Sequence, residues 1–308
     1  MNKYDVFSEA YYVMIATCLR GQESVEELNT RTGQRIRVLP GGASFRVDLA
    51  PGALPVIGIR KTFPHIAAAE TAWCLLGHNH VDWLRRHTPV WDRFADDQPC
   101  TVCEGRGSHD NGSIESRCEN CGGSGQVFWL QQAYGNRWRN TFGVDQLAVG
   151  LERLMADPSD RRVWISSWDP GEDIKESKQK TVPCPVGFTL NVIAGRLNSA
   201  LMIRSSDLYY GLPYDVMRHA LVMDACAASL GAKPGIMRVT LAHPHVYQRQ
   251  WSEAAQMLAQ KPIVPRIDLP GLSVDQITDD PDNYVEAMKA IGLMCDWPEF
   301  RGQTEVVA

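Results

Sequence analysis

Residues 186–231 read VGFTLNVIAGRLNSALMIRSSDLYYGLPYDVMRHALVMDACAASLG, and this stretch decides the fold class. Two runs of apolar and branched residues flank AGR, a turn signal, which predicts two strands joined by a hairpin. Apolar residues then follow at helical spacing from Pro213, which predicts one long helix that ends at Gly231. Residues 235–247, GIMRVTLAHPHVY, predict one further strand. Strands and helices in this order predict an α/β or α+β layered domain.

The same patterns continue through the rest of the chain. Helical spacing predicts an amphipathic helix over 5–20 and a helix over 64–87 that is interrupted near Gly77. Strand-like runs occur at 29–39, 44–49 and 161–169. The residues PGGA at 40–43 separate the first two of these runs, so we expect a hairpin turn there.

The composition is that of an ordinary globular protein. Of 308 residues, 44% are hydrophobic and 22% charged, and the formal net charge of −5 implies no general polyanion-binding surface. No stretch approaches the roughly 18 consecutive apolar residues of a membrane span. Asp5 and Glu9 stand where a signal peptide would be basic, so we expect a cytoplasmic protein. Five of the nine cysteines are scattered, which fits a reducing compartment.

Residues 98–125, which we call the four-cysteine segment, are rich in Gly, Ser and Cys and carry almost no apolar side chains. Cys100 and Cys103 form one C-x-x-C pair, and Cys118 and Cys121 form another after 14 residues. Two such pairs close a tetrahedral zinc site. Both continue as C-x-x-C-x-G-x-G, and the glycines permit turns that aim backbone amides at sulfur.

This local pattern resembles the zinc-binding repeats of the DnaJ chaperone family. With four protein ligands the site would be closed, so we predict a structural Zn²⁺ in a zinc-ribbon-like insert. Free surface thiols or a redox pair are the alternatives. Basic and aromatic residues are sparse in the segment, so we expect no nucleic-acid partner.

Cys184, in VPCPVGF at 182–188, is a candidate nucleophile. Proline on both sides restricts the backbone and aims the side chain, although a buried cysteine is more often a small apolar residue. Arginines in polar turns could together hold a phosphate dianion and lower the pKa of a thiol. They are Arg31, Arg161, Arg162 and Arg204. Each of them alone would pass for a solvated surface charge.

Nine stretches occur in the order and with the spacing of the thymidylate synthase family, which the chain resembles over nearly its whole length. They are NTRTGQ, AAAETAWCLLG, VWDRFAD, YGNRWRN, DPSDRRVWISSWDPGE, VPCPVGF, RSSDLYYGLPYD, GAKPG and AHPHVYQ. The resemblance implies a three-layer fold with a mixed β-sheet. It implies one catalytic domain over residues 1–308, with the four-cysteine segment inserted at a place where family members vary in length.

The resemblance also implies a covalent mechanism with 5,10-methylenetetrahydrofolate as cofactor. Cys184 would add to C6 of a pyrimidine nucleoside monophosphate, which makes C5 able to attack an electrophile. Glu70 would be the general acid/base acting through ordered water, and Tyr134 would lie beside the same water network.

The remaining implied contacts concern binding of the nucleotide and the folate. The phosphate would be held by Arg31, Arg204 and Ser205, and by Arg161 and Arg162 from the other subunit of an obligate homodimer. The sugar hydroxyl would bind His245 and Tyr247. The folate would contact Trp91, Asp207 and Gly211, with Asp207 on the pterin. No membrane partner is implied.

Three positions depart from the synthase pattern. The residue after the nucleophile is usually histidine and is Pro185 here. Thr189 replaces a glutamine of the following strand, and Asp169 replaces an asparagine.

Asp215 indicates which base is bound. The matching position is asparagine in family enzymes acting on dUMP and aspartate in the deoxycytidylate hydroxymethylases, which this chain resembles in that respect. A carboxylic acid can donate to N3 of cytosine and accept from N4–H, and a carboxylate can do the equivalent with an N3-protonated cytosine. Taken alone, Asp215 would better suit a helix N-cap, since an apolar helical run follows it, and only the family resemblance favours the base-reading role.

The resemblance therefore predicts a folate-dependent deoxycytidylate 5-hydroxymethyltransferase, acting on dCMP or on CMP. Water adding to an exocyclic methylene at C5 gives hydroxymethyl, whereas hydride from the folate gives methyl. A dCMP C5-methyltransferase is the first alternative and a thymidylate synthase the second. A zinc-containing binding module with an inactive core is a further alternative, which the intact Cys184 and Glu70 disfavour.

Overall fold

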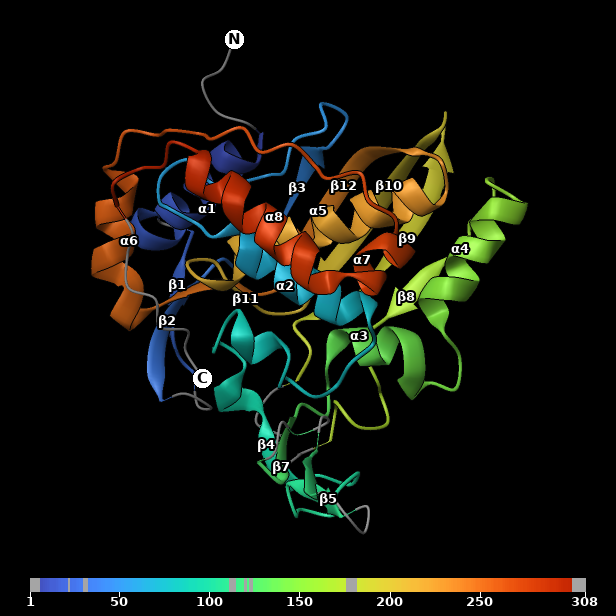
Figure 1. The fold of residues 1–308 in the computed structure, drawn as a ribbon. Helices are drawn as coiled ribbons and strands as arrows, with labels where there is room; N and C mark the ends of the chain where they lie inside the picture. Colours follow the sequence, from blue (N-terminus) through green and yellow to red (C-terminus); the bar gives the residue numbers. More distant parts are fainter. Residues whose placement is uncertain are drawn as a thin grey trace.

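A five-stranded sheet forms one side of the molecule, and three helices cover it in successive layers (Figure 1). The computed structural model describes residues 6–21, 23–29, 33–110, 115–118, 121, 124–175 and 182–300. The strand order is β3-β12-β10-β9-β8. Their bounds are Ala43–Asp48 (β3), Lys233–Leu241 (β12), Arg196–Ile203 (β10), Pro185–Ile193 (β9) and Trp164–Ser166 (β8). Strand β10 runs parallel to β12 and antiparallel to β9, so the sheet is mixed as predicted.

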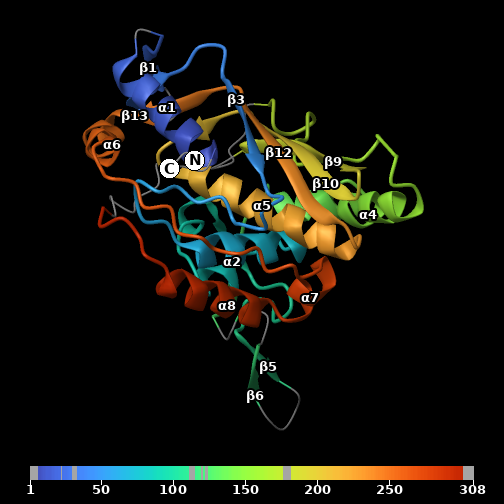
Figure 2. The ribbon, with the colours of Figure 1, turned by 90° about the horizontal axis from the view of Figure 1, so that it is seen from above.

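Two of the three helix layers are buried almost all round, and the outermost helix keeps one exposed polar face. Helix α5 (Gly211–Ser229) packs on β10 and β12, α2 (Pro64–Leu75) packs on α5, and α8 (Pro281–Met294) packs on α2 (Figure 2). Every residue from 216 to 227 is buried, because α5 is covered on one side by the sheet and on the other by α2. Alanines in the middle of α2 let these helix axes approach closely.

A second sheet has the order β1-β2-β13-β11. Its strands are Val25–Asn29 (β1), Gln34–Val38 (β2), Pro244–Tyr247 (β13) and Ser206–Asp207 (β11). The hairpin predicted at PGGA is wrong, because β2 pairs with β1 and β13 while β3 pairs with β12 in the other sheet. Gly41 and Gly42 both have positive φ, and a Cβ on Gly42 would lie 2.2 Å from the Leu241 carbonyl oxygen. The chain therefore passes from one sheet to the other at this point.

The single strand predicted over 235–247 is also two strands in different sheets, β12 and β13. Pro244 begins the second strand, and a proline cannot continue the hydrogen bonding of the first. The chain likewise passes from β10 in the large sheet to β11 in the small one, and β11 pairs in parallel with β13. Residues that follow two neighbouring strands of the large sheet thereby come together in the small one.

Several local predictions are confirmed. Strands β9 and β10 form the expected hairpin, with Ala194 and Gly195 at φ of 50° and 70°. Gly231, at φ 63°, follows the end of α5, and Gly77, at φ 70°, follows the end of α2. Helix α1 occupies Val6–Arg20, close to the predicted range.

The four-cysteine segment projects from the body of the molecule on a two-stranded stem (Figure 1). The stem pairs β4 (Asp96–Pro99) with β7 (Gln126–Trp129), and beyond it β5 (Ser108–Asp110) pairs with β6 (Glu115–Arg117). The remaining helical elements are η1 (Leu84–Arg86), η2 (Asp92–Phe94), α3 (Tyr134–Asn136), η3 (Arg137–Thr141), α4 (Gln146–Ala156), η4 (Gln248–Gln250), α6 (Trp251–Leu258) and α7 (Val274–Asp279). Of the helices in the described parts of the chain, none has the length and apolar character needed to span a membrane.

The close packing of α3 against α2 requires a glycine. A Cβ on Gly135 would lie 2.1 Å from the Cys74 carbonyl oxygen and 2.3 Å from its Cα, and a buried helix backbone cannot move aside. We expect Gly135→Ala to lower the free energy of unfolding by about 1–3 kcal/mol or more, measured by urea denaturation. The exposed Gly171→Ala is the matched control and should stay within about 0.5 kcal/mol of wild type. Wild-type stability in Gly135→Ala would contradict this packing.

Candidate active site

Cys184 directly precedes β9 and is half-buried. The two residues before Cys184 are held by Arg204, which follows β10. The Arg204 Nε donates to the Pro183 carbonyl at 2.8 Å, and its Nη2 donates to the Val182 carbonyl at 2.9 Å. The Arg204 backbone N–H donates to the Cys184 carbonyl, also at 2.9 Å. The predicted phosphate ligand thus uses two side-chain donors to brace the loop that carries the candidate nucleophile.

An ionic cluster lies between α2 and α5. Arg218 donates from Nη1 to Glu70 Oε2 at 3.0 Å and from Nη2 to Asp215 Oδ1 at 2.5 Å. The side chains of Arg218 and Glu70 are 6% and 7% exposed, so this is a nearly dry ion pair, and Asp215 is 15% exposed. The second oxygen of Glu70 accepts a hydrogen bond from Trp91 Nε1 at 2.9 Å.

Tyr134 connects this cluster with the cysteine. The Arg218 guanidinium lies 4.8 Å from the centre of the Tyr134 ring, and the Trp91 ring meets that ring edge-on at 5.7 Å. Burial raises the pKa of Tyr134 well above its ordinary value, and the nearby charges of Cys184, Asp215 and Glu70 add to the rise. The charges of the three other residues predicted as catalytic, which come from separate segments, therefore all act on one tyrosine.

Asp215 lies inside a helix rather than at its start. Helix α5 begins at Gly211 with Tyr210 as its N-cap, so the N-cap alternative for Asp215 is wrong. Burial raises the pKa of Asp215 to about 6, although Arg218 opposes that rise. Among the described residues, only Arg218 hydrogen-bonds to this carboxyl group, through Oδ1.

Two of the predicted folate residues, Asp207 and Gly211, lie at the turn from β11 into α5. Asp207 Oδ1 accepts from the backbone N–H groups of Tyr209 and Tyr210, and Oδ2 accepts from Gln250 Nε2 at 2.8 Å. This carboxylate therefore also shapes the turn into α5. Gly211 begins α5, and a Cβ there would lie 3.7 Å from the Asp207 Cβ.

The neighbouring strand β13 supplies the two predicted sugar ligands. His245 is the register partner of Asp207, so the candidate sugar and folate residues are adjacent. Its ring lies 4.9 Å from that of Tyr247, edge to face. Both side chains are buried. Ser205, half-buried, directly precedes β11, which pairs with β13.

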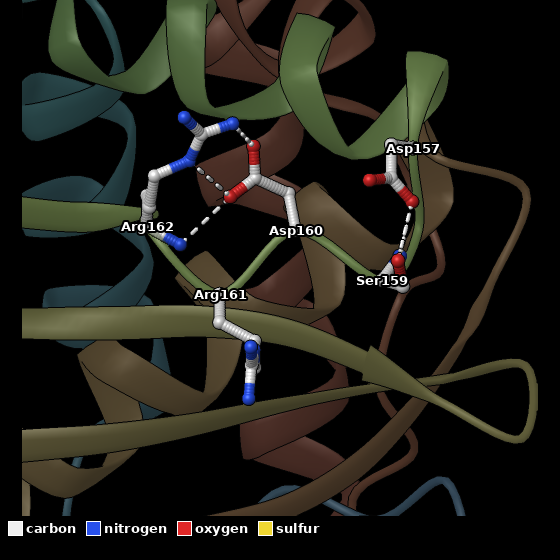
Figure 3. Close-up of a pocket in the computed structure, with 5 residues that line it drawn as sticks. All are labelled: Asp157, Ser159, Asp160, Arg161 and Arg162. Carbon is white, nitrogen blue, oxygen red and sulfur yellow. Dashed lines mark hydrogen bonds and ion pairs between the residues drawn. The ribbon is translucent and has the colours of Figure 1, made fainter.

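Three of the four predicted phosphate arginines are described, and they fall into two groups. Arg31 lies outside the described residues. Arg161 and Arg162 line a surface pocket before β8, with Asp157, Ser159 and Asp160 (Figure 3). Arg162 pairs with Asp160 through Nε at 3.2 Å and Nη2 at 3.1 Å, whereas Arg161 extends away from that pair. Both of these arginines are exposed, whereas Arg204 is half-buried beside the Cys184 loop.

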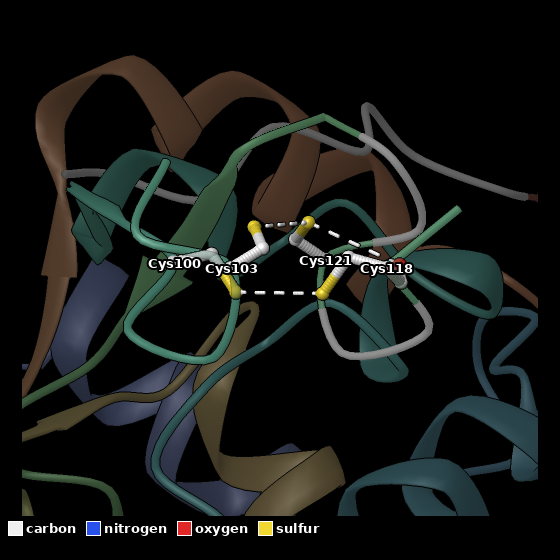
Figure 4. Close-up of side chains that lie close together, drawn as sticks. All are labelled: Cys100, Cys103, Cys118 and Cys121. Carbon is white, nitrogen blue, oxygen red and sulfur yellow. Dashed lines mark hydrogen bonds between the residues drawn. The ribbon is translucent and has the colours of Figure 1, made fainter. Parts of the chain in front are cut away.

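The four cysteines of the four-cysteine segment converge, with all sulfur atoms within 4.8 Å of one another (Figure 4). The Cys100–Cys118 and Cys103–Cys121 sulfur distances are 3.9 and 3.7 Å. A tetrahedron with metal–sulfur bonds of about 2.3 Å has edges of about 3.8 Å, so the donor set fits zinc. The last glycine of each repeat donates its N–H to sulfur, Gly107 to Cys103 at 3.2 Å and Gly125 to Cys121 at 3.3 Å.

Arg218 is the site residue that the sequence patterns did not reveal. Its position three residues after Asp215 on a predicted helix puts the two side chains on one face, and this spacing of acid and base is the signal that could have found it. Its contact with Glu70 joins residues 148 positions apart and carries no local signal.

The family model described as thymidylate synthase matches residues 9–288, which include every described residue of the site and the four-cysteine segment. Nearly the whole chain is covered, and the mixed sheet with its helix layers agrees with that fold. The chain therefore belongs to the thymidylate synthase family of folate-dependent one-carbon transferases, which act on C5 of pyrimidine nucleotides.

Proposed function

We propose that this protein transfers a hydroxymethyl group to C5 of a cytidylate, dCMP or CMP, with 5,10-methylenetetrahydrofolate. The observation that carries the proposal is Asp215. Its carboxyl group is buried, is held by Arg218 at one oxygen, and accepts nothing at Oδ2 from the described residues. A family enzyme that reads uracil places an asparagine at this position.

The two bases present opposite hydrogen-bonding edges to Asp215. Cytosine offers an acceptor at N3 and a donor at N4, whereas uracil offers a donor at N3 and an acceptor at O4. A carboxyl group that shares one proton with N3 also accepts from N4–H, so both N3 and N4 of cytosine have a partner at Asp215. Uracil would face O4 with a second acceptor, at a cost of about 1–3 kcal/mol.

The other residues also support chemistry at C5. The Cys184 sulfur forms a bond to C6 and later leaves it, while the braced loop holds the sulfur in place. Glu70 moves protons through water, with its two oxygens oriented by Trp91 and Arg218. Bound methylenetetrahydrofolate would supply the one-carbon unit to C5 and depart as tetrahydrofolate, and Trp91, Asp207 and Gly211 are the residues that would hold it. Water would then add to the exocyclic methylene left at C5 and give the hydroxymethyl product.

The substrate and product are tested with separate incubations of dCMP, CMP and dUMP with methylenetetrahydrofolate, weighed by mass spectrometry. We expect a hydroxymethyl mass gain on a cytidylate, and no product with Cys184→Ala. Asp215→Asn should lower kcat/KM for the cytidylate by a factor of roughly 5–150, the equivalent of about 1–3 kcal/mol. Turnover of dUMP alone would overturn the proposal, and a methyl mass gain would select the methyltransferase instead.

We also propose a homodimer that pairs the uncovered face of the large sheet, since family members are typically homodimers. One row of register partners on the face away from α5 runs across all five strands. It consists of Trp164, Thr189, Ala200, Arg238 and Arg46, none of them buried. Trp164 is 48% exposed and Met202, on the same face, 38%. Arg161 and Arg162 precede β8 at the edge of this face and are exposed, so they are suited to reach a partner's phosphate.

Mixed dimers test whether the arginines act across the interface. Cys184→Ala and the double variant Arg161→Ala/Arg162→Ala should each be inactive. Hybrids should regain activity, because one site then combines an intact cysteine with a partner's intact arginines. With random mixing about a quarter of all sites would be complete. No recovery in hybrids confirmed by two affinity tags would mean that the arginines act within their own subunit.

The third part of the proposal is a catalytic domain of residues 1–308 in which the four-cysteine segment is held by structural zinc. The four sulfur atoms, two N–H···S contacts and near absence of apolar side chains all support a metal in place of a hydrophobic core. The stem lies between Trp91 and Tyr134 in the chain, because β4 follows Trp91 and β7 precedes Tyr134. The metal would thereby stabilise the chain between two residues of the site.

Metal analysis of protein purified without chelators should find one zinc per chain. Cys118→Ser/Cys121→Ser should lose the zinc and become sensitive to protease within residues 98–125, because the segment has no other core. Cys295→Ser, which removes a half-buried thiol outside the cluster, is the control and should retain both properties. A zinc content far below one per chain would remove the metal from the proposal.

A further inference from the structure

Arg218 contacts both Glu70, the candidate proton-transfer residue, and Asp215, the candidate base-reading residue. It has both of its terminal nitrogens engaged, Nη1 with Glu70 and Nη2 with Asp215. The three side chains come from two helices and are 6 to 15% exposed, so water screens their charges little. A bridge between two acids in such a place orients both of them.

Other charged and titratable groups face this bridge from each neighbouring element. Helix α2 contributes Cys74 beside Glu70, α3 contributes Tyr134, and the Asp207 charge acts from β11. Burial raises the pKa of Cys74 to about 12, so its thiol stays neutral. Arg218 is the cation shared by these groups, and the two carboxylates, by outweighing the effect of burial, raise its own pKa.

We infer that Arg218 is a positioning residue that sets the protonation of Asp215 and couples base recognition to proton transfer at Glu70. This inference rests on the proposed function, in which Asp215 reads cytosine. With Oδ1 held by Arg218, Oδ2 is the oxygen that faces the ring and shares a proton with N3. The same guanidinium orients Glu70. Arg218 therefore links the position of Asp215 against the base to the position of Glu70.

The sign of the pH effect follows from proton counting. Cytosine binding needs one proton between Asp215 and N3, and above about pH 6, the pKa of Asp215, that proton must be taken up. Affinity for a cytidylate therefore falls as pH rises above this value. Arg218 favours the ionised carboxylate, so removing it raises the pKa of Asp215 and moves the decline in affinity to higher pH, by about one to three pH units.

The experiment measures dCMP, CMP and dUMP binding by calorimetry from pH 5.5 to 8.5 without folate, together with kcat for the turned-over nucleotide. Arg218→Met should shift the decline of cytidylate affinity upward by at least about one pH unit. Its kcat should fall tenfold or more because Glu70 loses a partner, while affinity at pH 8 is kept or improved. Arg266→Met, which breaks a surface ion pair with Asp268, is the matched control and should change neither quantity.

Arg218→Lys separates charge from geometry. It keeps the cation, so its pH profile should remain near that of wild type, but one ammonium group cannot make both directed contacts and kcat should still fall. If thermal unfolding shows that Arg218→Met does not fold, the lysine variant and Arg218→Met/Asp215→Asn, which lacks the unpaired Asp215 charge, carry the test. The double variant should lose the pH dependence of cytidylate binding.

The outcomes distinguish failure of the proposed function from failure of the role of Arg218. Wild-type preference for dUMP defeats the proposed function before any variant is measured. Wild-type preference for a cytidylate together with an unshifted pH profile in folded Arg218→Met overturns the role of Arg218 alone. Wild-type kcat in Arg218→Lys would show that the bridge to Glu70 is not needed and would overturn the coupling.

Discussion

The burial of α5 between the large sheet and α2 is the constraint on which the rest of the structure depends. It places Asp215 and Arg218, on one face of α5, against Glu70 of α2. The opposite face of the helix rests on strands β10 and β12, and β10 is hydrogen-bonded to β9, which follows Cys184. Any loss of this packing would separate the candidate nucleophile from both acids at once.

An ionic group at this depth is expensive to maintain. Removing one partner of a buried ion pair leaves an uncompensated charge, which typically costs about 3–5 kcal/mol. A well-packed apolar pair of similar volume is often at least as stable, so stability alone is weak grounds for keeping Arg218 between two acids. The arrangement is better explained by what it does to the two carboxyl groups, namely orienting both and opposing the rise in the pKa of Asp215 that burial causes.

The division of two strands between two sheets builds the other half of the site. Strands β10 and β12 each leave the large sheet and continue as β11 and β13, which pair in the small one. Asp207 and His245 become neighbours in this way, next to the turn that begins α5. The four-cysteine segment leaves the body between Trp91 and Tyr134, two aromatic rings in contact within the site. The stem of the segment is therefore connected to the body between two candidate site residues that touch.

Much of this could be predicted from local sequence. The β9–β10 hairpin, the end of α5 before Gly231 and the end of α2 before Gly77 follow from turn residues and spacing, which act over a few positions. The cysteine cluster was predicted because two C-x-x-C pairs at this spacing are typical of a tetrahedral metal site. The candidate residues of the covalent site were predicted through motifs. The hairpin at PGGA and the single strand over 235–247 failed, because strand partners are chosen by contacts between distant segments.

The sequence by itself determined the β9–β10 hairpin, the ends of α2 and α5, the cysteine cluster and the presence of an acid at position 215. Only the tertiary structure decided that this acid lies within a helix rather than at its cap, and that it shares Arg218 with Glu70. The physical reason is that hydrogen-bonding periodicity and turn preferences are local properties of the chain. The partner of a buried charge, in contrast, is set by which helices pack together, and here that joins residues 148 positions apart.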